Sequence, residues 1–123
     1  MRKPQGPESE QLTEVIIKGI EDKKGQNITV MDLRSIEHAV TDFFVICDGT
    51  SNTQVSAIAD SIEETVRNDL GDKPWHKEGK ESSEWVLLDY VYVVAHVFQK
   101  PIREFYNIEE LWGDAEIREI EVK

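Results

Sequence analysis

The stretch FFVICDGTS, residues 43–51, sets the fold class of this chain. Residues 43–47 form a continuous apolar run, and such a run is typical of a central strand that is covered on both faces. The next three residues interrupt the run. Ser51 is followed three residues later by Gln54, a capping-box pattern that predicts the start of a helix. A buried strand that leads through a short turn into a helix indicates an α/β protein.

The segments around this stretch extend the same pattern. Apolar residues recur at helical spacing up to Leu70, and Gly71 is well placed to end that helix. A second helix is predicted over residues 9–23. Strands are predicted where β-branched and aromatic residues gather, and short helices near the C-terminus: strands at 28–33, 43–47, 75–78, 85–88 and 91–98, helices at 102–106 and 109–112. We therefore predict an α/β domain in which a single mixed β-sheet of about five strands is flanked by helices.

Both ends of the chain differ in composition from the middle. Residues 1–8 hold two prolines and a glycine without apolar periodicity, and we expect them to form a flexible leader. Residues 9–113 form the predicted domain. Residues 114–123 are an acidic C-terminal tail, for which an extra helical turn and disorder both remain open.

Charge and cysteine content limit the classes of function. The 123 residues carry 14 Lys and Arg against 25 Asp and Glu, a net charge of −11. Too few cations are present to bind a phosphate backbone tightly, so we expect no direct DNA binding, whereas docking on a basic protein is favoured. A single cysteine suits a reducing compartment. No apolar run approaches the ~20 residues of a membrane span, and the start of the chain lacks the apolar region of a secretory signal. A cytoplasmic protein with no membrane attachment is expected.

The turn Gly49-Thr50-Ser51 raises the question of a phosphate site. A strand, a Gly-Ser-type turn and a helix are also how nucleotidyltransferases begin, and those enzymes need two or three carboxylates on neighbouring strands to hold a divalent metal. The following strands supply only Asp89, position 92 is Tyr, and no Asp-x-Asp pair occurs in the sequence. We therefore expect a helix entry and no catalytic residues. A metal-dependent nucleotidyltransferase stays open as the alternative and would need a second carboxylate beside Asp89.

The metal-ligating residue types are scattered along the chain. His38, His76, His96 and Cys47 contain no short-spaced pair, so no metal site and no cofactor are expected. A Cys47 nucleophile with His96 as its base is conceivable only if their strands adjoin. Cys47 lies in an apolar strand, where thiols are usually buried and inert.

The segment 90–98 has two different faces if it is one strand. Its odd positions are small and aliphatic, as a core face packed against helices should be. Its even positions include Tyr90, His96 and Phe98. Such an aromatic face is typical of a protein-binding patch, to which Trp85 and Trp112 could add. The alternative is a second small core beneath the C-terminal segment, and both interpretations can hold together.

Three sets of short motifs follow one another between residues 12 and 112. The first set is Asp42-Phe43-Phe44-Val45-Ile46, Gly49-Thr50-Ser51 and Ile58-Ala59-Asp60; the second is Glu78-Gly79, Trp85-Val86-Leu87-Leu88-Asp89-Tyr90 and His96-Val97-Phe98; the third is Arg103, Phe105-Tyr106 and Leu111-Trp112. No single piece is specific, but the ordered set with this spacing resembles the ribosomal silencing factor family, also called RsfS or Iojap-like.

This resemblance implies a function without catalysis. Members bind the large ribosomal subunit through the fourteenth protein of its series, on the face that meets the small subunit, and so block subunit joining and repress translation. They are commonly homodimers with a nucleotidyltransferase-like fold that lacks the catalytic acids. A dimeric adaptor for another basic protein is a further alternative.

We expect two groups of residues to serve this function. The docking surface would be lined or supported by Trp85, Leu88, Asp89, Tyr90, His96, Phe98, Tyr106 and Trp112, whereas Asp42, Gly49 and Ser51 would shape the strand-to-helix turn. The sequence departs from the family where Val91 and Tyr92 replace the usual Gly and Asp, and where Ala95 replaces a larger aliphatic residue. A hairpin turn of different geometry is therefore expected after Tyr90.

Overall fold

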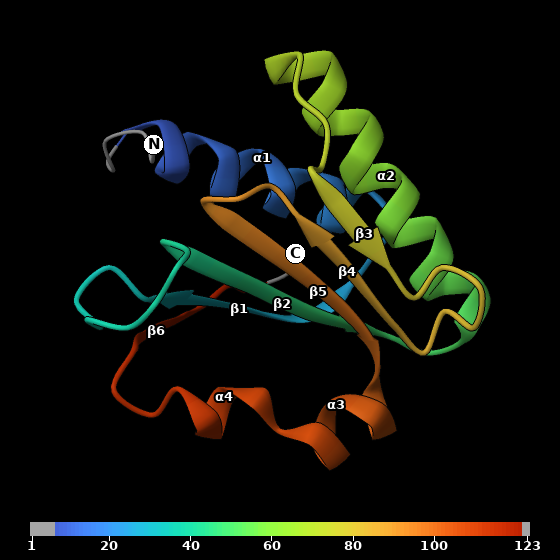
Figure 1. The fold of residues 1–123 in the computed structure, drawn as a ribbon. Coiled ribbons are helices and arrows are strands. Elements are labelled where there is room, and N and C mark those ends of the chain that lie inside the picture. The colour runs from blue at the N-terminus through green and yellow to red at the C-terminus, as the bar shows by residue number, and fades with distance from the viewer. Residues whose placement is uncertain (1–6, 122–123) are drawn as a thin grey trace.

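One mixed sheet organises the part of the chain that the computed structural model describes, residues 7–121 (Figure 1). The elements in chain order are α1 (Pro7–Asp22), β1 (Gln26–Asp32), β2 (Phe43–Gly49), α2 (Asn52–Leu70), β3 (His76–Glu78), β4 (Trp85–Asp89), β5 (Val93–Gln99), α3 (Lys100–Tyr106), α4 (Ile108–Leu111) and β6 (Glu116–Glu119). The strands lie in the order β3-β4-β5-β2-β1-β6. Only β2 and β5 pair in parallel, and the other neighbours are antiparallel.

Helices cover both faces of this sheet. Figure 1 shows α1 and α2 on one face and the two short helices α3 and α4 on the other. The predicted α/β class and the single mixed sheet flanked by helices are confirmed, with six strands in place of about five. None of the helices among residues 7–121 is long and apolar enough to cross a membrane.

The sixth strand lies in the segment predicted to be an acidic tail. Residues 116–119 pair antiparallel with β1, from Asp32↔Glu116 to Thr29↔Glu119. Just beyond, the Ile120 N–H donates to the Ile28 carbonyl oxygen at 2.9 Å, and Ile120 packs against the main core. The prediction of a helical turn or disorder is therefore wrong for these residues, because the open edge of β1 supplies a partner that local sequence does not reveal.

The N-terminal boundary also shifts. Helix α1 begins at Pro7, two residues before the predicted start at Ser9. Proline suits the first turn of a helix because its missing N–H would have no partner there. The predicted leader otherwise lies in residues 1–6, outside the described residues.

Helix α2 begins and ends where the sequence predicts. Ser51 is its N-cap, and its side chain accepts a hydrogen bond from the Gln54 N–H at 3.1 Å. The Gln54 Oε1 atom in turn accepts from the Thr50 N–H at 2.7 Å, one residue before the position that an ordinary capping box uses. Gly71 ends the helix in the left-handed conformation with φ 66°.

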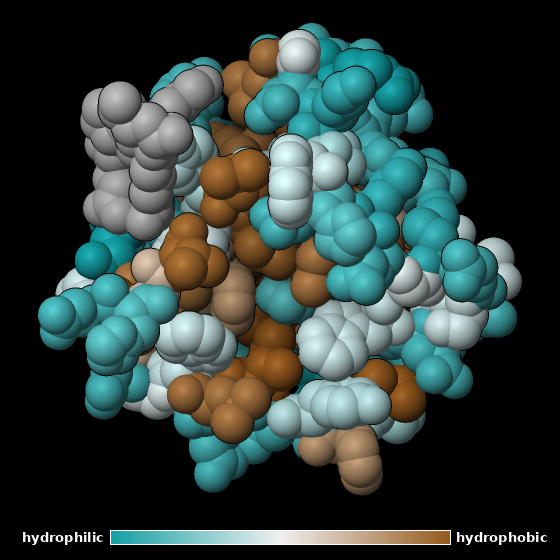
Figure 2. Space-filling view, in the orientation of Figure 1, coloured by the Kyte–Doolittle hydropathy of each residue, from teal (hydrophilic) through white to brown (hydrophobic). Residues whose placement is uncertain are grey.

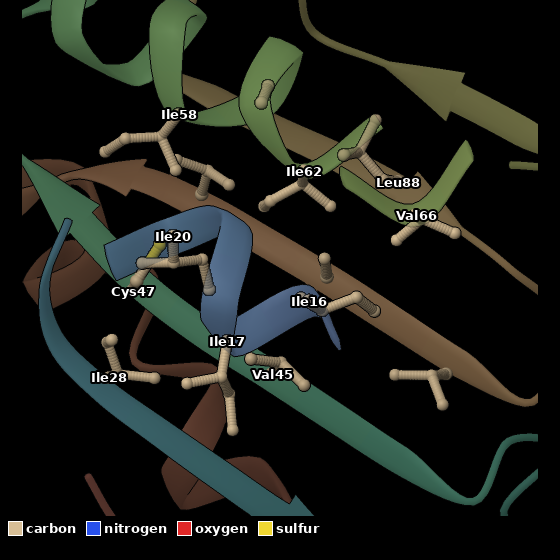
Figure 3. Packing of buried hydrophobic residues seen from close by; sticks show 14 of the residues in the cluster. Ile16, Ile17, Ile20, Ile28, Val45, Cys47, Ile58, Ile62, Val66 and Leu88 are labelled. Carbon is tan, nitrogen blue, oxygen red and sulfur yellow. The ribbon is translucent and has the colours of Figure 1, made fainter. Parts of the chain in front are cut away.

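The main core fills the space between α1, α2 and the sheet. In Figure 3, Ile16 and Ile20 of α1 lie near the β2 side chains of this face, and Ile58 and Ile62 project from α2 into the same core. The two helices approach closely at Gly19, where an added Cβ would lie 2.9 Å from the Ile62 Cα. These aliphatic contacts hold the sheet against α1 and α2, and the same sheet presents its opposite face to α3 and α4.

Cys47 belongs to this main core. Its side chain is fully buried, and burial raises the pKa of the thiol. Cys47 pairs with Val97 across β2 and β5, and Val97 shares the main core with it. The neighbouring His96 packs against Phe44 and Trp85 on the other face. The strands do adjoin, but the thiol and the imidazole lie on opposite sides of the sheet, so they do not form a nucleophile–base pair.

Candidate partner-binding face

The pleat of β4 and β5 decides which side chains face α3 and α4. Trp85, Leu87 and Asp89 alternate with Val86 and Leu88 along β4. Both of the latter are buried in the main core beneath α1 and α2, so the former three point to the opposite face. The antiparallel register continues this face onto β5 through the pairs Trp85↔Phe98, Leu87↔His96 and Asp89↔Val94.

Aromatic side chains gather on this second face, beside the aliphatic Met31, Leu33 and Ile46. The aromatic cluster, as we call it, consists of Phe44, Trp85, His96, Phe98, Tyr106 and Trp112. The Trp85 ring stacks on Phe98 with a centroid separation of 4.7 Å and lies 5.0 Å from the Tyr106 ring. Phe44 meets His96 at 4.6 Å and Trp112 at 5.8 Å, both edge to face. Each such contact contributes about 0.5–1.5 kcal/mol beyond area burial, so the cluster holds its rings in defined orientations.

His96 fixes the orientation of Trp85. The Trp85 indole Nε1–H donates to His96 Nδ1 at 3.1 Å. Because an indole nitrogen only donates, Nδ1 is the unprotonated nitrogen and the neutral imidazole carries its proton on Nε2. Burial lowers the pKa of His96 to about 3. The imidazole is therefore neutral at physiological pH, and its role here is to orient a ring.

Several large apolar side chains of the α3–α4 layer reach solvent. Phe105 is 79% exposed, Leu111 76% and Tyr106 51%. Together with the half-buried Trp85 and Trp112, they form what we call the aromatic patch. In Figure 2, brown and pale side chains gather at the bottom of the view, where α3 and α4 lie, whereas hydrophilic side chains cover the outer surface of α2. Gathered apolar exposure of this kind marks an interaction surface.

The rim of the aromatic patch is mainly acidic. Glu104, Glu110 and Asp114 are exposed in the segment that carries it, residues 100–114, and Lys100 is the exposed cation of this segment. An apolar centre with a charged rim is the usual anatomy of a protein interface. The sign of this rim favours a partner with basic groups around an apolar contact.

The sequence-predicted docking residues divide between the two faces. Trp85, Tyr106 and Trp112 belong to the aromatic patch, and His96 and Phe98 are buried directly beneath it. Asp89 is partly exposed on the same face of β4, but its Oδ1 atom accepts the Val91 N–H at 2.7 Å within the hairpin. Leu88 and Tyr90 are buried in the main core on the opposite face, so neither lines the patch.

The hairpin explains why Tyr90 leaves the aromatic face. Strand β5 begins only at Val93, and Val91 adopts the left-handed region with φ 77°. The Tyr92 N–H donates to the Tyr90 carbonyl oxygen at 3.0 Å, which closes a three-residue turn. This turn breaks the alternation that placed Tyr90 on the same side as His96. His96 and Phe98 are buried, as the second-core interpretation predicts, whereas Trp85, Tyr106 and Trp112 are partly or largely exposed.

Sequence reasoning missed Leu87, Phe105 and Leu111 as members of this face. Leu87 is partly buried between Trp85 and Asp89 along β4, and counting every second residue from Trp85 would have found it. Phe105 and Leu111 lie in short helices whose exposed sides have no sequence periodicity long enough to read. The sequence signal that could have identified them is the presence of large apolar residues in a segment otherwise rich in charged residues.

The three residues expected to shape the turn hold backbone segments together. The Asp42 backbone N–H donates to the Tyr92 carbonyl oxygen at 2.8 Å, and its carbonyl oxygen accepts from the Leu33 N–H at 2.8 Å. An added Cβ on Gly49 would lie 3.2 Å from Gln54 Oε1 and 3.3 Å from Val55 Cγ2, so a larger residue is crowded there. Together with the Ser51 cap, these contacts join β2 to α2 and to the hairpin.

Metal-ligating residue types are not gathered on this face. Within residues 7–121, no three His, Cys, Asp or Glu side chains lie close enough together to hold a metal ion. What the arrangement does provide is a rigid, partly solvent-exposed apolar surface with charged surroundings.

A family model decides where the chain belongs. The family described as "Ribosomal silencing factor during starvation" matches residues 6–123. The chain belongs to the ribosomal silencing factor family. The Halalkalibacterium halodurans protein named ribosomal silencing factor RsfS is 38% identical over 113 residues, 92% of this chain and 95% of that protein. A crystal structure of a Chromobacterium violaceum protein superposes with a TM-score of 0.81 at 36% identity, covering 87% of this chain and 88% of that one. A mouse relative, 32% identical over 78 residues (62% of this chain, 34% of that protein), is named mitochondrial assembly of ribosomal large subunit protein 1.

Proposed function

We propose that this ribosomal silencing factor binds the large ribosomal subunit through the fourteenth protein of its series and sterically blocks joining with the small subunit. Translation in the cytoplasm is repressed as a result. The observation that carries the proposal is the aromatic patch, a set of large exposed apolar side chains with an acidic rim in a protein of net charge −11. The mouse relative's name supports the large subunit as the partner.

Steric exclusion needs no reaction at the site. A stable interface buries roughly 800 Å² on each partner, and a few aromatic anchors at its centre supply most of the binding energy. Trp85 and Trp112 are suited to be such anchors, because the aromatic cluster holds their rings in place before a partner arrives. A bound protein on the intersubunit face then occupies the space that the small subunit requires.

Charge would accelerate the encounter with a basic partner. Complementary charges raise association rates at low salt, and this advantage falls as ionic strength increases. The excess of 25 acidic over 14 basic residues supports this contribution. We therefore expect association with the large subunit to slow at higher salt, with a smaller change in the dissociation rate.

Co-sedimentation with separated ribosomal subunits tests the proposal. The wild type should migrate with the large subunit only and reduce the fraction of joined ribosomes in a mixture of both. Replacing Phe105 and Leu111 together by alanine should abolish co-migration while leaving the fold intact, because both side chains are largely exposed. The matched control is Trp75→Ala, which removes an exposed aromatic just before β3, outside the patch.

The alternatives have different outcomes in the same experiment. A wild type that migrates with neither subunit contradicts the proposal, and capture of another basic protein would then indicate an adaptor. Magnesium-dependent nucleotide binding would instead revive the nucleotidyltransferase. Homodimerisation belongs to the proposal as well, and sedimentation of the free Phe105/Leu111 double variant would show whether the dimer uses the same patch.

A further inference from the structure

Arg103 joins the α3–α4 layer to the sheet. It lies on α3 and is buried, with 8% of its surface exposed. Its guanidinium Nη1 donates to the Asn27 carbonyl oxygen at 2.6 Å and to the Asp48 carboxylate at 3.1 Å. Its Nη2 donates to Thr29 Oγ1 at 3.1 Å. One side chain therefore reaches both β1 and β2.

The same guanidinium also holds α4. Arg103 Nε and Nη2 donate to the two carboxylate oxygens of Glu109 at 3.3 and 3.0 Å, a forked arrangement. The Arg103 carbonyl oxygen accepts the N–H of Asn107, the residue in left-handed conformation that ends α3 and begins α4. Arg103 thus contacts α4 and the sheet from its position on α3.

Neither helix has the means to hold this position alone. Helix α3 has 7 residues and α4 has 4, far below the length at which an isolated helix is stable. Their apolar attachment rests on Ile108, which is buried, and on Ile102 and Trp112, which are partly buried. Tyr106 adds a ring contact with Trp85, whereas Phe105 and Leu111 face solvent and contribute little to holding the layer.

We infer that Arg103 is a positioning residue for the aromatic patch: its bonds to Asp48, Thr29, Asn27 and Glu109 lock the α3–α4 layer in the arrangement that a partner binds. The inference rests on the proposed function, since it assigns a determinant of the same surface. Holding a surface in its bound geometry raises affinity because less conformational freedom is lost on binding. Loss of the guanidinium should therefore loosen this layer more than the rest of the fold.

Variants of the network separate this role from general stabilisation. Arg103→Met removes all side-chain bonds but leaves the buried Asp48 carboxylate with the Asn27 side chain as its remaining partner. The double variant Arg103→Met/Asp48→Asn also removes that charge, so it keeps the test valid if the single variant fails to fold. Arg103→Lys keeps a charge near Asp48 but lacks the fork that reaches Glu109. Arg118→Met is the control, because it breaks an exposed ion pair with Glu14 elsewhere on the molecule.

Two measurements read the result. Amide hydrogen exchange of the free protein should accelerate roughly tenfold or more over residues 100–112 in Arg103→Met and in the double variant, with α2 unchanged. Affinity of the folded protein for purified large subunits should fall roughly tenfold or more, with partial recovery in Arg103→Lys and no change in Arg118→Met. Faster exchange that spreads equally to α2 would identify a purely structural role and overturn the inference.

The outcomes also separate this inference from the proposed function. If the wild type binds large subunits and the double variant binds equally well despite faster exchange in residues 100–112, Arg103 does not position the patch. If the wild type does not bind at all, the proposed function fails, whereas local acceleration of exchange still supports Arg103 as the residue that locks the layer.

Discussion

The two faces of the sheet differ in their side chains and in the length of the helices that cover them. The face under α1 and α2 is aliphatic and is covered by helices of 16 and 19 residues. The face under α3 and α4 carries the aromatic cluster beside Met31, Leu33 and Ile46, and it is covered by helices of 7 and 4 residues, which leave Phe105 and Leu111 in solvent. The first face thus holds the larger cluster of buried apolar side chains, and the second leaves large apolar side chains exposed.

Under the proposed function, this division predicts that stability and binding depend on different faces of the sheet. Changes in the aliphatic face should lower the free energy of unfolding without altering the affinity of molecules that remain folded. Changes at the surface of the aromatic face should do the reverse. Changes at His96 and Arg103 should affect both stability and binding, because both residues are buried and both contact groups of the aromatic face.

Truncation of the aliphatic face should give the largest effect. Ile62 is fully buried where α2 meets α1, and Ile62→Ala should lower the free energy of unfolding by about 3 kcal/mol through lost burial and a cavity. Urea unfolding followed by circular dichroism measures this. Co-sedimentation at a temperature where the variant is folded should match the wild type, and weaker binding there would show that the faces are coupled.

The second largest effect should come from lowering the pH, which should reduce the free energy of unfolding through His96 on the aromatic face. Burial lowers the pKa of His96 to about 3 from its ordinary value of 6.5. Between these values the unfolded chain binds a proton that the folded chain refuses, so the stabilisation present above pH 6.5 is lost as the pH falls. From pH 7 to pH 5, this group alone should lower the free energy of unfolding by about 2 kcal/mol.

A variant isolates that contribution from the titration of the acidic surface. In His96→Gln the difference in unfolding free energy between pH 7 and pH 5 should be smaller by that amount than in the wild type. Equal differences in both proteins would mean that the imidazole accepts a proton in the folded state.

Trp112→Ala should weaken binding more than stability. The ring is half-buried against Phe44 and contributes to the surface of the patch. Loss of an aromatic anchor at an interface typically costs more than about 1 kcal/mol, a loss of affinity of roughly fivefold or more. The comparison variant is Tyr90→Ala, whose ring is buried in the main core. Tyr90→Ala should chiefly lower the free energy of unfolding, and a reversed pattern would mean that the docking surface is placed on the wrong face.

A structural feature can be predicted from the sequence when the residues that determine it lie close together in the chain. The strand at 43–47, the Ser51 cap and the end of α2 at Gly71 are all predicted, because each is set by residues within one turn of it. Strand β6 is not predictable in this way, since its charged segment becomes a strand only by pairing with β1. The burial of Arg103 likewise depends on Asp48, which is 55 residues away in the chain.

The faces of β4 and β5 show the same limit. Alternation correctly separates His96 from Val97, and it groups Trp85 with Phe98 once the register is known. It fails at Tyr90 because the turn at Val91 resets the alternation before β5 begins. The membership of Leu87 in the aromatic face, and of Leu88 in the aliphatic one, follows from simple alternation along β4 once Trp85 is placed.

Val91→Gly should produce the smallest effect and the opposite sign. Val91 holds φ at 77°, a region that a β-branched residue rarely adopts, and such strain costs of order 1–3 kcal/mol. Glycine relieves it but gains backbone freedom in the unfolded chain, which offsets about 0.5–1 kcal/mol. We expect a net gain of about 1 kcal/mol in the free energy of unfolding, measured by urea denaturation. Val91→Ala retains the Cβ and should gain less. Binding should not change in either variant, because Val91 lies outside the aromatic patch; a loss of stability in Val91→Gly would show that the turn is held without strain.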